Sequence, residues 1–275
     1  MPNCRYCGKP AGFLKFSHSE CRQSHDEGRL QIATLAHGSL VDRNMSDLQP
    51  KIAAIANTHF VGDAELRKTL IEQWTKVVDE VLNDNLVDHE HEQALVRYQQ
   101  QFNLTQADLD HTGAFMRLGK AAVLRDVMEG KVPSTLKLTG TIPFNLQKNE
   151  TLIWLFKDTT YVETRTHTEY VGRSAGVSVR VAKGVYYRTS AFRGRPVQHA
   201  QIAKSGHGLL GVTNKNLFFT TGARSLKIPY SKIVSFHQYG DGIGIQRDAK
   251  TAKPEAFVTG DGWFTYNLVA NAAHL

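Results

Sequence analysis

The chain of 275 residues has a hydrophobic content of 41%, a charged content of 21% and three cysteines, as expected for a globular protein long enough for more than one domain. No apolar run approaches the roughly 18 residues that span a bilayer, and the first residues lack the apolar core of a signal peptide, which argues against a transmembrane or exported protein. We therefore expect a cytoplasmic protein, in which three clustered cysteines favour metal ligation over a disulfide framework.

The net charge of +7 is concentrated in the second half of the chain. Residues 1–140 carry 16 basic and 18 acidic side chains, whereas residues 141–275 carry 17 basic and 8 acidic ones, a local net charge of +9. This asymmetry favours a negative partner for the second half, such as an anionic membrane surface, a nucleic acid or an acidic protein. A basic surface without any partner is the alternative.

All three cysteines and one histidine at matching spacing lie in the stretch CRYCGKPAGFLKFSHSEC. Cys4 and Cys7 form one pair, His18 and Cys21 form a second, and ten residues separate the pairs. The two-residue gap within each pair lets both members face one ion at about 2.0–2.3 Å. Because four protein ligands leave no open coordination position, we predict a structural Zn²⁺ site with one ion per chain.

Two alternatives to this ligand set stay open. His25 lies four residues beyond Cys21 and is a competing ligand, although the symmetry of the two pairs favours His18. The cysteines can also be free thiols in a segment without fixed structure. Gly8 favours the metal site, because a glycine directly after the second cysteine permits the backbone to fold around an ion.

Residues 29–132 are predicted to form a small helical bundle, since no segment there shows strand alternation. Apolar residues recur at spacings of three and four within DAELRKTLIEQWTKVVDEVLND, with Asp63 as the predicted N-cap. The residues of this apolar face are Leu66, Leu70, Trp74, Val77, Val78 and Val81. An earlier helical stretch is expected to be interrupted near Pro50, and Thr105 with Asp108 predicts a capping box further along.

A turn rich in carboxylates and histidines lies within this helical region. It comprises Asp84, Asp88, His89, Glu90, His91 and Glu92. These side chains can bind a metal, but the turn lacks the alternating Asp/Asn spacing and the central glycine of a calcium loop. A solvated helix N-terminus, where carboxylates suit the helix dipole, is the interpretation that we favour.

Residues 141–275 are predicted to form an antiparallel β domain. β-Branched and aromatic stretches alternate with Asn-Lys-Asn, Thr-Gly and Asp-Gly turn signals, which predicts many short strands. Asp261 is the predicted N-cap of a final helix, in which Phe264, Leu268 and Val269 would face the sheet. The expected architecture is a small barrel or bent sandwich with this helix capping one open end.

Basic and aromatic residues alternate in one part of this β domain. The candidate ligand-binding residues are Arg180, Lys183, Arg188, Arg193 and Arg195. They lie among Tyr186, Tyr187 and Phe192, and the turn FRGRP is the predicted contact loop. Such a surface can bind phosphoinositide-type head groups, acidic peptides or a nucleic-acid backbone. The alternative is one hairpin with an exposed basic face and a buried aromatic face.

These segments resemble three known kinds of domain. The cysteine stretch resembles the small zinc ribbon found at the start of a group of bacterial multidomain proteins. LNDNLVDHEHEQALVRYQQQFNLT looks like part of a TerB-type (tellurite-resistance-like) helical domain. The stretch VSVRVAKGVYYRTSAFRGRPV, together with GLLGVTNKNLFFTTGARSLKIPYSKIVSFHQYGDGIGI, resembles bacterial PH-like (GRAM-like) domains. The resemblance implies an α+β multidomain protein, connected with metal or with stress and phage response, and it transfers no reaction.

We therefore expect a zinc ribbon over residues 1–28, a TerB-like helical domain over 29–132 and a PH-like β domain over 141–275. The sequence shows no nucleophile elbow, His-Glu-x-x-His motif or dinucleotide-binding loop. This favours a non-enzymatic adaptor whose β domain binds a protein partner or an anionic surface. The alternatives are a nucleic-acid-binding protein that uses the ribbon and the basic β face, and an enzyme with an unrecognised site between domains.

Overall fold

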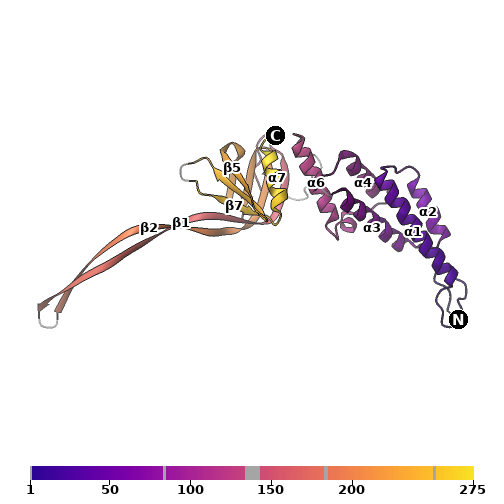
Figure 1. Cartoon of the computed structure of the whole chain (residues 1–275), viewed down its shortest axis with the longest axis horizontal. Helices are drawn as coiled ribbons and strands as arrows, with labels where there is room; N and C mark the ends of the chain where they lie inside the picture. The colour runs from indigo at the N-terminus through magenta and orange to yellow at the C-terminus, as the bar shows by residue number, and fades with distance from the viewer. Residues whose placement is uncertain (1, 83–84, 134–142, 183–184, 250–251) are drawn as a thin grey trace. The chain divides into compact units, whose positions relative to one another are not determined.

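The computed structural model describes residues 2–82, 85–133, 143–182, 185–249 and 252–275; within these ranges, the side chains of residues 164–205 are not described. The fold is α+β and divides into two compact units, Met1–Lys131 and Val132–Leu275. The first unit is helical and the second contains a seven-stranded antiparallel sheet (Figure 1). No helix in the described part of the chain is long and apolar enough to cross a membrane.

The first unit is a bundle of helices that follows the short N-terminal cysteine segment. Its elements are α1 Ser19–Val41, α2 Leu48–Thr58, α3 Asp63–Val81, α4 His89–Gln101, α5 Gln106–Leu109 and α6 Ala114–Met128. Helix α1 packs against α2, α3 and α4, and the core contains the fully buried Trp74, Tyr98 and Leu124. Tyr98 and Trp74 keep their polar atoms paired, because the Tyr98 hydroxyl donates to the Leu70 carbonyl and the Trp74 indole donates to the Leu95 carbonyl.

Helix α1 joins the cysteine segment to the bundle as one continuous element. Its buried residues recur at helical spacing, from His25 and Gly28 through Ile32 to Leu40. Gly28 is required by close packing, since a Cβ there would lie 2.2 Å from the Cβ of His59. The helix therefore continues across residue 28, where the sequence suggested a boundary between domains.

The expected apolar face of α3 is confirmed, with Leu70, Trp74, Val77 and Val78 buried. The predicted capping box is also present at α5, where the Asp108 N–H donates to Thr105 and the Asp108 carboxylate accepts from the Thr105 N–H.

Two helix boundaries were predicted wrongly. Asp63 is the first helical residue of α3 and does not cap it, because Gly62 occupies the N-cap position. Pro50 does not interrupt a helix; it lies in the first turn of α2, where its missing N–H would have no partner. The interruption comes earlier, at Asp42–Asp47, where Arg43 and Asp47 adopt positive φ angles of 57° and 54°.

The second unit is an open sheet covered by one helix. Its elements are β1 Leu152–Ala182, β2 Val185–Thr213, β3 Asn216–Thr220, β4 Ser225–Pro229, β5 Ile233–Gln238, β6 Gly242–Arg247, β7 Glu255–Val258 and α7 Gly262–Ala272. The strand order is β4-β3-β2-β1-β7-β6-β5. The prediction of short strands holds for β3 to β7 but is wrong for β1 and β2, which have 31 and 29 residues.

The core of the second unit forms where β1 pairs with both β2 and β7. Tyr161 of β1 lies opposite Phe257 of β7, and both rings contact Phe219 of β3 at centroid distances of 5.4 and 5.6 Å. Helix α7 begins as predicted, because the Asp261 carboxylate accepts a hydrogen bond from the Phe264 N–H. Phe264 is buried against Trp154, with ring centroids 5.1 Å apart, so α7 packs on the sheet.

Candidate metal centre

The first ligand pair lies in a tight turn of the backbone. The Gly8 N–H donates to the Cys4 carbonyl over 2.9 Å, and the Cys4 N–H donates to the Lys9 carbonyl over 2.7 Å. Gly8 has a φ of +71°, a conformation that favours glycine, so this residue permits the tight turn of the backbone. This turn holds Cys4 and Cys7 on one side of the chain.

The second ligand pair lies at the start of α1. His18 is the N-cap residue and Cys21 is in the first turn, with the Arg22 N–H donating to the His18 carbonyl over 3.1 Å. The two segments are joined by the Arg5 N–H, which donates to the Phe16 carbonyl over 3.0 Å. Helical geometry thus fixes one ligand pair and a glycine turn fixes the other.

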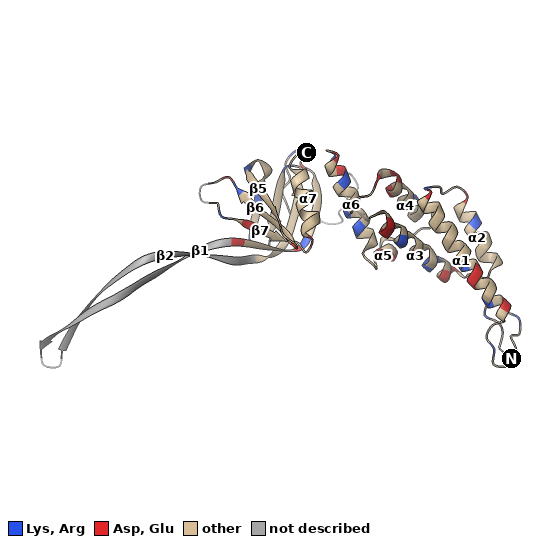
Figure 2. Ribbon diagram, in the orientation of Figure 1, with Lys and Arg blue, Asp and Glu red and all other residues tan. Residues whose placement is uncertain are grey.

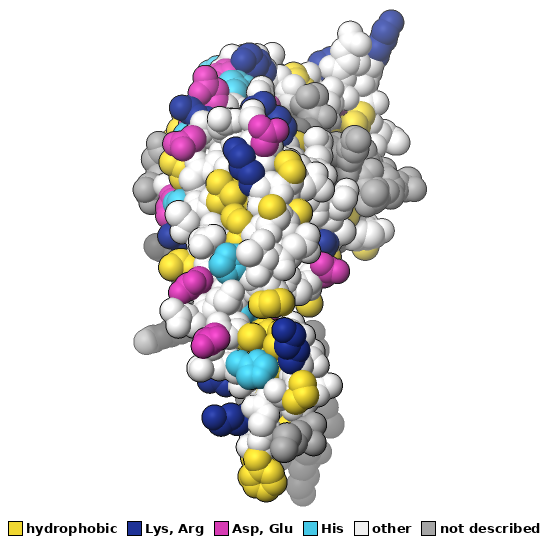
Figure 3. Space-filling model, turned by 90° about the vertical axis from the view of Figure 1, so that its right-hand side faces the viewer, with side chains coloured by type: hydrophobic (Ala, Val, Ile, Leu, Met, Phe, Trp, Pro, Cys, Tyr) yellow, Lys and Arg dark blue, Asp and Glu magenta, His cyan; other side chains and the backbone are white. Residues whose placement is uncertain are grey.

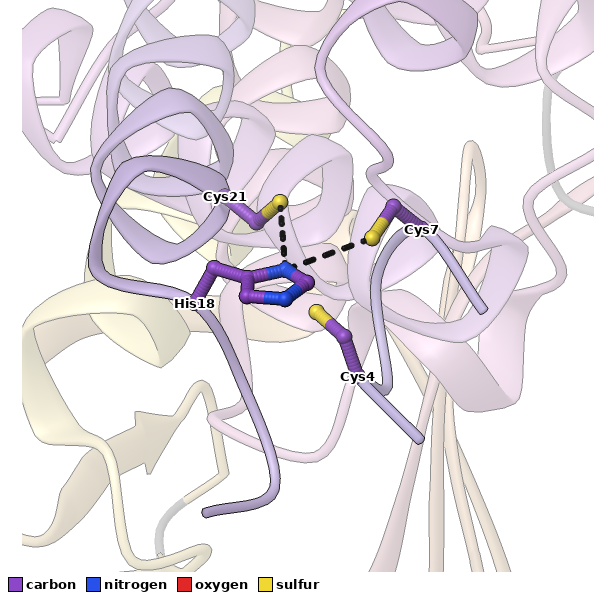
Figure 4. A group of neighbouring side chains, drawn as sticks. All are labelled: Cys4, Cys7, His18 and Cys21. Carbon is purple, nitrogen blue, oxygen red and sulfur yellow. Dashed lines mark hydrogen bonds between the residues drawn. The ribbon is translucent and has the colours of Figure 1, made fainter. Parts of the chain in front are cut away.

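The four predicted ligands come together in space (Figure 4). One candidate ligand atom from each of Cys4, Cys7, His18 and Cys21 lies within 4.8 Å of the other three. The His18 Nδ1 atom lies 3.5 Å from the Cys7 sulfur and 3.6 Å from the Cys21 sulfur. A tetrahedral zinc ion bound at about 2.3 Å to sulfur and about 2.05 Å to nitrogen separates those ligands by about 3.6 Å. The spacing therefore fits ligands that share one tetrahedral ion.

The hydrogen bonding of His18 identifies which ring nitrogen is available to a metal. Nε2 lies 3.0 Å from the Pro10 carbonyl oxygen, which can only accept, so Nε2 carries the proton of the neutral ring. Nδ1 is then unprotonated and presents its lone pair toward the sulfurs. A backbone carbonyl that orients a histidine in this way is the usual outer partner of a metal-bound imidazole. No sequence pattern indicated this role of Pro10, because the acceptor belongs to the backbone.

The thiols differ in how readily they ionise. Burial raises the pKa of Cys4, but the backbone N–H groups of Cys7, His18 and Tyr6 outweigh it and lower the pKa to about 6. At Cys21, burial together with the neighbouring sulfurs of Cys7 and Cys4 raises the pKa to about 11. Adjacent thiolates repel one another, and a bound cation would remove that repulsion.

His25, the competing ligand in the sequence, lies outside this cluster. It is buried, its Nε2 is 2.7 Å from the Glu65 carboxylate, and its Nδ1 is 3.4 Å from the Asp26 carboxylate. Its ring also contacts Tyr6 at a centroid distance of 4.6 Å. His25 therefore connects the cysteine segment to α1 and α3, a role that the sequence did not indicate.

The acidic turn forms a helix start and ion pairs. Asp88 is the N-cap of α4 and accepts from the His91 N–H over 2.8 Å. Glu92 pairs with Arg125 at 2.7 Å, and Glu90 pairs with Arg43. Asp84 lies outside the described residues. In the described part of the chain, Cys4, Cys7, His18 and Cys21 form the one group of three or more such side chains close enough to share an ion.

The basic candidate residues of the β unit lie outside the described residues. Lys183 falls in an undescribed position, and Arg180, Arg188, Arg193 and Arg195 belong to the strand segments whose side chains are not described. From the sequence, residues 164–205 contain eight Lys and Arg against one acidic residue, a net charge of +7. The positive excess thus lies in this segment, whereas both signs are interspersed over the helices of the first unit (Figure 2).

Comparisons with protein-family models, with curated proteins and with solved structures found no match to this chain.

Proposed function

We propose that the chain is a non-enzymatic interaction protein stabilised by one structural Zn²⁺ ion. The observation that carries the metal assignment is the closed set of three sulfurs and one imidazole nitrogen, within 4.8 Å of one another. Such soft and borderline donors in a tetrahedral arrangement suit zinc, and four protein ligands leave no position for a substrate or a reactive water. The metal would therefore fold the segment and would not perform chemistry.

Elemental analysis of the purified full-length protein tests this assignment. We expect one zinc per chain, lost in Cys7→Ser because three remaining ligands bind far more weakly. His25→Gln is the matched control, since His25 lies next to the cluster but outside it. A folded protein that contains no metal, with residues 2–18 ordered, contradicts the proposal.

For the second unit we propose a PH-like (GRAM-like) module that binds an anionic or protein ligand. Its strand order, with two antiparallel groups joined through β1 and β7 and a final helix on the sheet, supports this assignment. The net charge of +7 over residues 164–205 supports an anionic ligand. Binding of an inositol polyphosphate and of polyglutamate to the full chain is expected to weaken in a variant whose residues Arg180, Lys183, Arg188, Arg193 and Arg195 are all changed to Gln. Equal binding by this variant contradicts the assignment of these residues.

The charge of residues 164–205 also favours a second candidate function, binding to nucleic acid. Contacts to phosphates release counterions, so affinity for duplex DNA or RNA should fall steeply and linearly in a plot of log affinity against log salt. Tighter binding to an oligonucleotide than to polyglutamate of equal charge supports this candidate. Equal binding to both polymers supports the anionic-ligand module instead.

The helical unit is proposed to be TerB-like, which connects the protein with cytoplasmic stress or phage response in bacteria. The support is the resemblance of the segment that includes α4, together with the helical bundle around it. Deleting the gene and challenging the cells with phage and with tellurite tests the connection. Unchanged survival under both challenges contradicts it.

A further inference from the structure

We propose that the loop between the two ligand pairs, residues 8–17, docks onto an anionic lipid surface. This interligand loop contains the three most exposed large hydrophobic side chains in the described part of the chain: Phe13 is 81% exposed, Leu14 76% and Phe16 70%. Single exposed hydrophobic residues are common on proteins, but three within four positions form a patch. Aromatic and aliphatic side chains on a protruding loop suit insertion into the headgroup region of a bilayer.

The backbone presents these side chains outward. Leu14 has a φ of 57°, a left-handed conformation that bulky residues rarely adopt, and Gly12 beside it has a φ of 96°. Such a conformation persists where the surrounding structure imposes it, and it often marks a functional position. Here the loop keeps Leu14 exposed, next to Phe13.

The charges around the interligand loop suit an anionic surface. Arg5, Lys9 and Lys15 are exposed, and residues 2–18 contain no acidic side chain. The first carboxylate along the chain is Glu20, which already belongs to α1. Apolar and basic side chains gather at the lower end of the face shown in Figure 3, with acidic side chains further up. Each Lys or Arg close to an anionic leaflet contributes about a fivefold gain in affinity.

A protein partner is the competing occupant of this region. A hollow of about 1040 Å³ lies beside the loop and α1, and its lining includes Leu14, Phe16 and Leu30. The hollow is lined by both signs of charge, with Glu20, Asp26 and Glu27 near Lys15 and Arg22. Phe13, the most exposed large hydrophobic side chain among the described residues, does not line it. A lipid surface accounts for Phe13 and for the absence of acidic residues from the loop, and a segment bound in the hollow accounts for neither.

The docking depends on the metal and therefore rests on the proposed zinc site. Cys7 directly precedes the loop and His18 directly follows it, so one ion fixes both ends. The Arg5 N–H to Phe16 carbonyl bond and the Pro10 carbonyl near His18 Nε2 hold the interior of the loop to the same site. Without the ion, the loop would be disordered in the free protein. Docking onto the lipid surface would then have to order it, and this entropy cost lowers the affinity for the surface.

Co-sedimentation of the full chain with vesicles of phosphatidylcholine, with and without phosphatidylserine, tests the proposal. All proteins carry the five Gln substitutions of the β unit, so that these five residues do not contribute, and the remaining basic residues of that unit are the same in every protein compared. We expect binding to the anionic vesicles, at least about tenfold weaker in Phe13→Ser/Phe16→Ser and about 25-fold weaker in Lys9→Gln/Lys15→Gln. Leu30→Ser is the matched control, because Leu30 is 69% exposed but lies on α1, and it should bind as the parent protein does.

The zinc content, measured on every sample, separates this proposal from the metal assignment. If zinc-containing protein does not bind anionic vesicles, the docking proposal is wrong and the metal assignment is unaffected. Vesicle binding that does not change when a chelator removes the zinc overturns the metal dependence of the docking and leaves the metal site in place. Folded protein that is purified without zinc overturns the metal site itself. Vesicle binding that Leu30→Ser abolishes while Phe13→Ser/Phe16→Ser retains it shows that the interligand loop is not the lipid contact and overturns the proposal.

Discussion

The cysteine segment and the helical bundle of the same unit are stabilised in opposite ways. Among residues 2–18, only Cys4 and Ala11 are buried, and the large side chains Phe13, Leu14 and Phe16 are exposed. The bundle instead buries a continuous core that includes Trp74, Tyr98 and Leu95. A segment of that length cannot exclude enough apolar surface from water to fold alone, so under the proposed zinc site it would depend on a few strong ligand bonds.

The difference determines how each region should fail. A core distributes its stability over many weak contacts, so the loss of one side chain removes only part of it. A four-ligand site concentrates its stability in one ion, so the loss of one ligand removes most of it. Replacing one ligand should therefore abolish the ordered structure of the cysteine segment completely. Replacing one core residue should lower the stability of the bundle only in part.

The largest expected effect is that of Cys7→Ser. We predict loss of the bound zinc and of the ordered conformation of residues 2–18, because a serine hydroxyl is a poor zinc ligand. The bundle should keep its helical content, since its core contains no residue of the segment. Elemental analysis measures the metal, and amide hydrogen exchange measures order in the two regions separately.

The effect of Cys7→Ser on the bundle shows whether the helices fold independently of the metal site. If Cys7→Ser also unfolds α2 to α6, the bundle depends on the metal and the contrast between the two regions is wrong. His25→Gln should keep its zinc, because His25 bonds to Glu65 and Asp26 and lies outside the ligand cluster.

The second effect in size is that of Trp74→Ala in the bundle core. Trp74 is 1% exposed and its indole donates to the Leu95 carbonyl, so the substitution leaves a cavity and removes this hydrogen bond. We expect the free energy of unfolding to fall by about 3–5 kcal/mol. Urea denaturation measures it, with Met116→Ala as an exposed control expected to change it by less than about 0.5 kcal/mol. Zinc content should stay at one per chain, and a loss of zinc would show that the two regions are not separable.

Replacing Asp108 in the capping box of α5 is expected to have a smaller effect on stability. The Thr105 hydroxyl and the Arg67 guanidinium lower the pKa of Asp108 to about 2, with Arg67 bound to the carboxylate at 2.7 Å. The ordinary pKa is about 4, so the charged form stabilises the fold above pH of about 4, and this stabilisation is lost as the pH falls toward about 2. Asp108→Asn should be less stable than the wild type at pH 6 and should approach it near pH 2. A difference that does not change with pH contradicts this account.

The sequence was sufficient for the features that depend on local spacing. The two-residue gaps identified the four side chains that come together in space, and the helical period identified the buried face of α3, because both patterns repeat within a few residues. The caps at Thr105 and Asp261 were found for the same reason.

Features that depend on distant parts of the chain were not predictable from the sequence. The Pro10 carbonyl that orients His18 is a backbone group with no side-chain signal. The contact between His25 and Glu65 joins residues 40 positions apart, and a lone histidine in a helix gives no indication of its partner. The length of β1 and β2 was missed because the β-branched and aromatic stretches of this region were interpreted as many short strands.

The smallest predicted effect concerns the junction between the two regions. Tyr6 belongs to the cysteine segment, and its ring contacts the ring of His25 on α1 at a centroid distance of 4.6 Å. Tyr6→Leu should lower the free energy of unfolding by less than about 1.5 kcal/mol, the size of one aromatic contact. Zinc affinity should fall slightly in the same variant, because Tyr6 lies between Cys4 and Cys7 and holds their turn against the bundle.

A double-mutant cycle of Tyr6→Leu with His25→Gln decides whether this contact couples the regions. If the cost of Tyr6→Leu disappears when His25 is already replaced, the contact transmits the order of the metal site into α1. If the two costs simply add, the regions share a continuous helix but no energetic coupling through these rings. The cysteine segment could then lose its metal, and with it the exposed loop, without any change in the stability of the bundle.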